Sequence, residues 1–319
     1  MEHRRLGRSG LKVSELCLGA WINFGQRIED EQTFGVLNAA LDEGIDFFDT
    51  ADVYAGGKAE EVMGRWMKDK GEDRRQITIA TKCRGRMWEG SNGEGLSRKH
   101  IMDACHDSLR RLQTDYIDLY QVHWPDPETP LEETMRALNE LIAAGKVRYI
   151  GCSNHNSEQI GEAARICETL GLNKFISSQP YYNMLGRGIE KNDVPRCLAE
   201  GLGLIPYSPL AQGLLSEKYL GGEIPEGSRA KGNADLEKRL RETLPTLQAL
   251  GKWAQDRDMT LSQLALAWLL HQPAMASPII GATTPEQVRE NALASTTKLS
   301  AADLQEIEDI LVPPKSDEE

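Results

Sequence analysis

The fold of this chain is decided by three short apolar segments that carry ionisable residues: FFDTADVY (Phe47–Tyr54), TIATK (Thr78–Lys82) and LYQVH (Leu119–His123). Their aromatic and branched residues are typical of buried strands. Asp49, Lys82 and His123 would stand at the ends of these strands, with Tyr54 just past the first. Because an unpaired buried charge is costly, we expect these four side chains to meet at one place.

Five further apolar runs have the same character, so the sequence predicts eight strands: Glu15–Ala20, Phe47–Asp52, Thr78–Cys83, Ile117–His123, Arg148–Asn154, Ile176–Tyr182, Gly203–Pro209 and Ser277–Thr283. Amphipathic stretches with helical spacing alternate with them: Glu31–Glu43, Lys58–Lys70, Ser97–Leu112, Leu131–Ala144, Ser157–Leu170, Asp193–Glu200, Leu261–Leu270 and Pro285–Ala294. Strand–helix units that follow one another without a linker favour a (β/α)8 TIM barrel, formed as one domain by residues 1–319. An open doubly wound sheet is the alternative, which the lack of a GxGxxG motif after the first strand weakens.

Two segments lie outside the repeat. The segment Leu210–Asp235 is rich in glycine, serine and charge, and it is too long for an ordinary connection, so we expect a lid or a disordered loop. The stretch Ala301–Leu311 predicts an additional C-terminal helix, and the polar tail VPPKSDEE is expected to fray.

Composition narrows the classes of function. The 319 residues carry a net charge of -12, which argues against general nucleic-acid binding. No apolar run approaches the roughly 18 residues of a membrane helix, and the N-terminal MEHRRLGRSG lacks the apolar stretch of a secretory signal, so we expect a cytoplasmic protein. The six cysteines form no CxxC pair and lack metal-ligand spacing, so neither a disulfide nor a metal site is expected.

The four side chains make chemical sense together. A tyrosine has an ordinary pKa near 10, and a neighbouring ammonium favours its phenolate, so Lys82 is expected to lower the pKa of Tyr54. Asp49 would keep Lys82 charged, and His123 would add a hydrogen bond to a substrate oxygen. Tyr54 would then exchange the proton as that oxygen changes between carbonyl and alcohol. The accompanying hydride needs a nicotinamide cofactor, since no side chain supplies one.

The chain resembles the aldo-keto reductases over nearly its whole length. The resemblance is carried by GIDFFDTADVYAGGKAEEVMG, ATK, QVHWPD, GKVRYIGCSN, PYSPLAQGLL and IIGATTPEQVREN. The stretches SPLAQGLLSEKY and GSRA are most similar to the branch that contains the potassium-channel β-subunit-like reductases and related bacterial enzymes. The resemblance implies a barrel that reduces aldehydes or ketones with a nicotinamide cofactor.

The resemblance also implies roles for individual residues. The catalytic tetrad of the family falls on Asp49, Tyr54, Lys82 and His123. Its cofactor-binding positions fall on Ser153, Asn154 and Gln179 for the carboxamide, Tyr207 for stacking on the nicotinamide, Ser208, Leu210, Gly213 and Lys218 for the pyrophosphate, and Arg229, Gly281, Thr283, Gln287, Glu290 and Asn291 around the adenosine and its 2′-phosphate. NADP(H) is favoured over NAD(H) because Arg229 can bind a phosphate bidentately. Thr283 departs from family members that carry a cation at its position.

Candidate residues for the substrate pocket are large aromatic and basic side chains near the strand ends. Trp21, Trp88 and Trp124 follow or adjoin strand ends and could form an apolar wall around a small-molecule carbonyl or alcohol. Arg84 and Arg86 could attract an anionic substrate or face solvent.

Two other functions stay open. One is a binding subunit that senses the state of its cofactor and turns over slowly, as the channel-related members of the family suggest. The other is a barrel aldolase that forms a Schiff base on Lys82, although an ion pair with Asp49 would keep this lysine protonated. The oligomeric state is not predicted.

Overall fold

The computed structural model describes residues 1–70 and 74–312. Its main sheet has eight strands in the order β10-β3-β4-β5-β6-β7-β8-β9, all neighbours being parallel. The bounds are β3 Cys17–Gly19, β4 Phe47–Asp49, β5 Thr78–Cys83, β6 Ile117–Val122, β7 Val147–Ser153, β8 Ser177–Gln179, β9 Gly203–Leu204 and β10 Ile279–Ile280. The expected barrel is confirmed, with strands that are mostly shorter than the apolar runs suggested.

The two edge strands of this sheet, β9 and β10, are joined through the segments next to them. The Leu204 amide donates to the carbonyl of Ala274 at 2.8 Å, and the Ala276 amide donates back to Leu204 at 2.9 Å. Beyond them, the Ile279 amide donates to the carbonyl of Pro206 at 2.8 Å. These bonds close the sheet between β9 and β10. Because all the strands are parallel, their C-terminal ends face one mouth.

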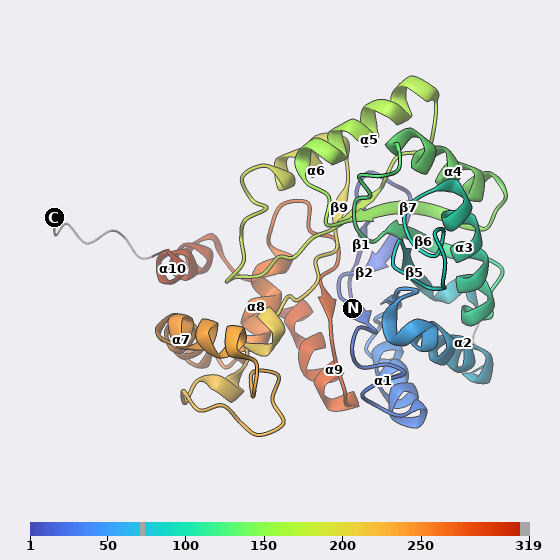
Figure 1. Ribbon diagram of the computed structural model, residues 1–319. Coiled ribbons are helices and arrows are strands. Elements are labelled where there is room, and N and C mark those ends of the chain that lie inside the picture. The colour runs from blue at the N-terminus through green and yellow to red at the C-terminus, as the bar shows by residue number, and fades with distance from the viewer. Residues whose placement is uncertain (71–73, 313–319) are drawn as a thin grey trace.

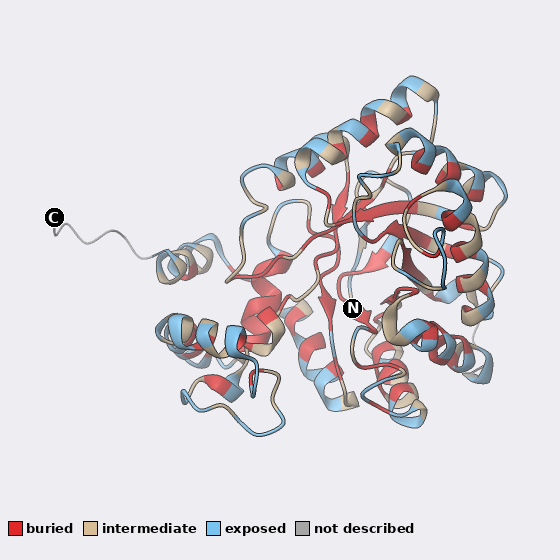
Figure 2. Cartoon of the chain, in the orientation of Figure 1, coloured by how far each residue is buried: buried red, intermediate tan, exposed pale blue. Residues whose placement is uncertain are grey.

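Helices surround the sheet (Figure 1). Their bounds are α1 Asp30–Asp42, α2 Lys58–Lys70, α3 Arg98–Leu112, α4 Leu131–Ala143, α5 Ser157–Leu170, α6 Asp193–Glu200, α7 Ala234–Gln255, α8 Leu261–Leu270, α9 Pro285–Ala292 and α10 Ala301–Leu311. Figure 2 shows that most of these helices have a buried side and an exposed side. Helix α8 differs, because all ten of its residues are buried. No helix in the described residues is both long and apolar enough to cross a membrane.

A hairpin of β1 (His3–Arg5) and β2 (Lys12–Ser14) precedes the barrel, and the strand pattern did not predict it. Leu6 and Val13 of this hairpin are fully buried against Phe47, Leu119 and other side chains of the barrel interior. Those barrel residues lie toward the N-terminal ends of their strands. The hairpin therefore closes the bottom of the barrel, opposite the mouth.

The helix α7 was also missed, because Pro245 interrupts a sequence that otherwise has helical spacing. Asn233 caps its first turn by accepting a hydrogen bond from the Leu236 amide. The C-terminal helix α10 is present as expected and packs beside α7, where Trp253 donates to Glu306 at 2.7 Å. Of the tail that was expected to fray, residues 313–319 lie outside the described part of the chain.

Candidate active site

A cavity of about 890 Å³ opens at the C-terminal ends of the strands. It is lined from β3 round to β10 and by the long segment that follows β9. The lining includes these residues expected from the sequence: Trp21, Asp49, Tyr54, His123, Trp124, Ser153, Asn154, Gln179, Tyr207, Ser208, Leu210, Gly213, Lys218, Arg229, Gly281, Thr283, Gln287, Glu290 and Asn291. The volume is within the range of sites for drug-sized ligands and cofactors, roughly 300–1,000 Å³.

A buried lysine joins the floor of the cavity to its wall. The Lys82 ammonium lies 2.5 Å from Oδ1 of Asp49 and donates to the carbonyl of Thr50 at 2.8 Å. Its third contact is the hydroxyl of Tyr54, at 3.2 Å. Lys82 is fully buried, and Asp49 is 3% exposed. The three donor positions of this ammonium are therefore all used within one network.

The second carboxylate oxygen of Asp49 is satisfied from the other side of the barrel. Gln179 donates to Oδ2 of Asp49 at 2.8 Å, and Gln121 donates to the same atom at 3.2 Å. Both amide side chains point into the barrel interior and donate to the same oxygen. Together they fix the orientation of the Asp49 carboxylate. Sequence reasoning missed Gln121, which the strand alternation places one step below His123 on the same face.

The position of Tyr54 follows from a tight turn after β4. The amides of Thr50 and Asp52 continue the pairing with β5 by donating to the carbonyls of Ala80 and Lys82. The short 3-10 segment η1 (Tyr54–Gly57) then reverses the chain, with Ala55 at φ 51° in the left-handed region. This turn brings the phenol back over Lys82.

The pKa of Tyr54 differs from the sequence-based expectation in direction. Burial raises it above its ordinary value of 10.0, and the lowering effect of the Lys82 ammonium does not overcome burial. Burial alone would lower the pKa of Lys82, but Asp49 and Tyr54 outweigh burial and the net pKa is raised. The expected net lowering for Tyr54 was therefore wrong, while the charged state of Lys82 agrees with its pairing. Tyr54 keeps its proton at neutral pH.

His123 faces the same cavity as a neutral ring. Burial lowers its pKa to about 2, helped by the charges of Lys82 and Arg84. The ring stacks on Trp124 with centroids 3.8 Å apart and meets the Tyr54 ring edge-on at 5.7 Å. Its Nδ1 atom is buried without a hydrogen-bond partner in the described chain. A neutral imidazole offers one N–H group to a ligand oxygen.

A second cluster of polar groups lies at the ends of β7 and β8. Ser153 donates to the carbonyl of Gln179 at 2.8 Å, and the Asn154 amide donates to the Ser153 hydroxyl at 3.0 Å. The Tyr207 hydroxyl donates to Oδ1 of Asn154 at 3.0 Å. Asn154 adopts φ 57°, a left-handed conformation that asparagine tolerates better than most residues. The cluster presents amide groups and one aromatic ring to the cavity.

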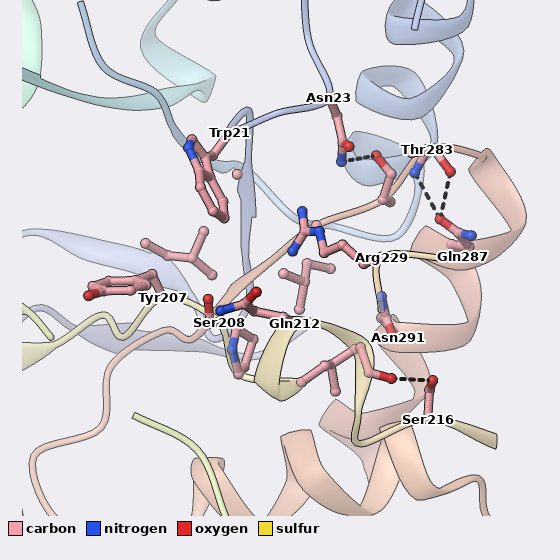
Figure 3. A pocket seen from close by; sticks show the side chains of 18 of the residues that line it. Trp21, Asn23, Tyr207, Ser208, Gln212, Ser216, Arg229, Thr283, Gln287 and Asn291 are labelled. Atoms are coloured by element: carbon pink, nitrogen blue, oxygen red, sulfur yellow. Dashed lines mark hydrogen bonds between the residues drawn. The ribbon is translucent and has the colours of Figure 1, made fainter. Parts of the chain in front are cut away.

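The long segment after β9 forms the far wall (Figure 3). It contains two short 3-10 turns, η3 (Ala211–Gly213) and η4 (Glu217–Tyr219), so it is ordered rather than a structureless loop. Gly213 adopts φ 95°, a conformation that favours glycine, at the turn over which the Lys218 side chain folds back. The Arg229 guanidinium projects into the cavity and lies 5.3 Å from the ring of Trp21.

Two expected residues do not line the cavity. Lys82 lies beneath it, reaching it through Tyr54, and Trp88 stacks on His100 with centroids 4.7 Å apart. Residues that sequence reasoning missed line it as well: Asn23, Arg27, Gln212, Ser216, Glu217 and Ser262. Asn23 and Arg27 follow the end of β3, and their place after a strand was the available signal.

The chemistry of the lining suits the dinucleotide that the sequence suggests. The cavity offers amide donors at one end, and cations from a long segment together with the capped start of α9 at the other. That donor set suits a ligand with a carboxamide and several phosphates, so a nicotinamide dinucleotide fits. No group of three or more metal-binding side chains occurs in residues 1–70 and 74–312.

Comparisons with known proteins agree with this geometry. The family model described as "Aldo/keto reductase family" matches residues 15–312. A probable voltage-gated potassium channel subunit beta from Oryza sativa subsp. japonica is 41% identical over 298 residues, covering 91% of this chain and 90% of that protein. A putative subunit of the same name from Schizosaccharomyces pombe is 40% identical over 319 residues, covering 97% of this chain and 92% of that protein. The chain therefore belongs to the aldo/keto reductase family.

Proposed function

We propose that this protein is an NADP(H)-dependent oxidoreductase that reduces aldehydes or ketones to alcohols. The observation that carries the proposal is the Tyr54 hydroxyl, which lines the cavity while it accepts a hydrogen bond from Lys82 at 3.2 Å. A proton donor at a cavity wall, backed by a buried cation, suits a reaction that develops negative charge on an oxygen.

The residues would divide the chemistry between them. A bound nicotinamide supplies the hydride that no side chain supplies. Tyr54 gives the proton of its hydroxyl to the substrate oxygen, and the resulting phenolate is stabilised by the Lys82 ammonium. Asp49 keeps that ammonium charged and in place through its 2.5 Å contact. His123 donates its single N–H group to the same oxygen and orients it.

The remaining lining residues would hold the cofactor. Asn154 and Gln179 suit a carboxamide, Tyr207 offers a ring for stacking, and the segment after β9 suits the pyrophosphate. Trp21 and Trp124 are 47% and 42% exposed, respectively, so they remain available as an apolar wall for the substrate. Trp88 is not part of this proposed wall.

A second candidate is a subunit that binds the cofactor and turns over slowly. Its support is the 41% identity to a protein named as a probable potassium channel subunit beta. Multiple turnovers with a simple aldehyde, at rates typical of enzymes, would argue against it.

The Schiff-base alternative is disfavoured by the environment of Lys82. A lysine must lose its proton to attack a carbonyl, and here Asp49 and Tyr54 raise its pKa despite its burial. Borohydride treatment with a carbonyl substrate should leave no adduct on Lys82, and an adduct there would restore the aldolase hypothesis.

The decisive experiment is a screen of aldehydes, ketones and sugars for oxidation of NADPH, repeated with NADH. We expect turnover with NADPH, and we expect Tyr54→Phe to lower kcat by about 10²- to 10⁴-fold. The variant should bind the cofactor as the unmodified protein does, because the phenol ring is retained. Full activity of Tyr54→Phe would overturn the mechanism, and failure to bind either nucleotide would overturn the proposal.

A further inference from the structure

The turn that carries Tyr54 is tied at its entry to the strand that carries Lys82. The Thr50 amide donates to the carbonyl of Ala80 at 2.9 Å, and the Asp52 amide donates to the carbonyl of Lys82 at 3.2 Å. Both acceptors belong to β5. The entry of the turn is therefore fixed directly to the backbone on both sides of Thr81.

The turn itself has an unfavourable backbone. Three consecutive residues, Ala55, Gly56 and Gly57, have φ values of 51°, 64° and 95°. Alanine seldom adopts a positive φ, and such a conformation persists where the surrounding structure imposes it. Contacts at the exit of the turn supply that constraint.

A buried glutamate ties the exit of the turn to the same strand. Glu60 lies in the first turn of α2 and is fully buried, and its Oε1 accepts a hydrogen bond from the Thr81 hydroxyl at 2.6 Å. Thr81 stands between Ala80 and Lys82, and alternation along β5 turns it to the opposite face from Lys82. Three consecutive residues of one strand thus hold both ends of the turn around Tyr54.

An arginine of the next helix holds Glu60 from the other side. Nε of Arg111, near the end of α3, donates to Oε2 of Glu60 at 2.7 Å. The stem of this arginine lies against η1, because a Cβ atom on Gly57 would be 2.8 Å from Cδ of Arg111. The Arg111 side chain is 17% exposed and that of Glu60 is fully covered, so solvent screens this ion pair less than an exposed one.

The other acidic group beneath the turn is neutral. Asp52 is fully buried, and burial together with the negative charge of Glu60 raises its pKa well above the ordinary value. Its Oδ1 accepts a hydrogen bond from the Val53 amide at 2.7 Å. Glu60 is therefore the carboxylate that pairs with Arg111, and loss of the arginine would leave a buried charge without its partner.

We infer that Glu60 and Arg111 are positioning residues for proton transfer by Tyr54. Neither of the two side chains lines the cavity. They act by fixing η1 against β5, which keeps the Tyr54 hydroxyl 3.2 Å from the Lys82 ammonium. The inference rests on the proposed function in so far as Tyr54 gives its proton to a substrate.

Steady-state kinetics with a matched pair of variants test this inference. Arg111→Gln should lower kcat by about 10- to 100-fold, because a displacement on the order of 1 Å at a reacting group has an effect of that size. KM and the Kd for NADPH should stay within about twofold, since the cofactor site is not touched. The control is Arg110→Gln on the same helix, because Arg110 is 76% exposed and pairs with Asp107 instead.

A double variant separates positioning from a general structural effect. Rates are expressed per NADPH-binding site, so that unfolded molecules are not counted. If Arg111 acts through Tyr54, then adding Arg111→Gln to Tyr54→Phe should leave the residual rate within about twofold. A general structural effect would lower the rate by the same factor in both backgrounds.

A measurement without turnover covers the case in which Arg111→Gln does not fold. Arg111→Lys keeps the positive charge, and Glu60→Gln keeps an acceptor for Thr81. The NMR resonance of the tyrosine Cζ carbon, labelled with ¹³C, reports the surroundings of the Tyr54 phenol and is assigned by its loss in Tyr54→Phe. This resonance should shift or broaden in both variants and stay unchanged in Arg110→Gln.

The outcomes distinguish this inference from the proposed function. An unchanged Tyr54 resonance in both Arg111→Lys and Glu60→Gln would overturn the inference, whatever the rates. Equal losses of kcat by Arg111→Gln with and without Tyr54→Phe would overturn it as well. If the unmodified protein turns over no carbonyl compound, the proposed function fails, and a shifted resonance in the two variants would still support the positioning of Tyr54.

Discussion

The Lys82 ammonium lies 2.5 Å from the carboxylate of Asp49 and 3.2 Å from the hydroxyl of Tyr54. One buried cation thus connects the interior of the barrel to the group at its mouth. The stability of the fold and the proposed chemistry depend on the same three atoms, and the following variants separate these two contributions.

The first prediction concerns the buried ion pair. Asp49→Asn leaves the Lys82 charge without its counter-charge, which should lower the free energy of unfolding by about 3–5 kcal/mol. Denaturation in urea measures this change. The double variant with Lys82→Met, which removes the orphaned charge, should recover part of the loss. An Asp49→Asn protein as stable as the parent would mean that the pair is not charged.

The second prediction concerns the pH dependence of reduction. Tyr54 must be protonated to act as an acid, and burial raises its pKa above the ordinary 10.0. The reduction rate expressed as kcat/KM should therefore show no loss from this group up to about pH 10. Initial rates in overlapping buffers check this, with Tyr54→Phe as the baseline. A Tyr54-dependent fall near pH 8 would contradict the burial argument.

The third prediction links His123 to stability. Its pKa is about 2 in the folded chain and near 6.5 when exposed, so below pH 6.5 the unfolded chain binds more protons. The stability contributed by the neutral ring is complete above pH 6.5 and is lost as pH falls toward 2. The slope from this residue should approach about 1.4 kcal/mol per pH unit.

His123→Gln provides the comparison, because glutamine does not titrate. Urea unfolding at pH 7.5 and pH 5 should show a larger loss of stability for the parent than for the variant. Equal losses in the two proteins would show that His123 does not carry the effect.

The fourth prediction concerns a close approach inside the barrel. A Cβ atom on Gly151 would lie 2.2 Å from Oγ of Ser177 and 3.3 Å from Cγ of Gln121. Gly151→Ala should cost about 1–3 kcal/mol of stability by overpacking and should displace Gln121, a partner of Asp49. Thermal unfolding and kcat measure the two effects. Gly188→Ala, which meets nothing within 4 Å, should change neither by much.

The barrel and its mouth could be predicted because they rest on local patterns. Buried parallel strands have continuous apolar runs, and alternation along them places Asp49 and Lys82 on the interior face. The hairpin that contains Leu6 and Val13 was missed because three-residue strands give too short a pattern. Helix α7 was missed because Pro245 normally ends a helix, whereas here the helix continues through it while packing against α8 and α10.

The site was less predictable where it depends on burial and on contacts distant in sequence. The direction of the Tyr54 pKa shift follows from how deeply the phenol is covered, which the sequence does not contain. Arg27 has no motif that marks it, and it lines the same cavity as Arg229 only because the chain folds two distant segments together. Trp88 was expected at the substrate wall from its place near a strand end, but its loop turns it onto His100.

The division between rigid strands and a long segment has a consequence for how such a protein can diversify. Asp49, Lys82 and His123 lie in the barrel strands or at their ends, and Tyr54 lies in a tight turn beside them. Lys218 and Arg229 instead belong to the 3-10 turns and loops that follow β9. Under the proposed function, exchanges in the segment after β9 would change the preference between dinucleotides and leave the proton-handling residues intact. Laboratory evolution of the nucleotide preference should therefore vary the segment after β9 and leave the barrel strands unchanged.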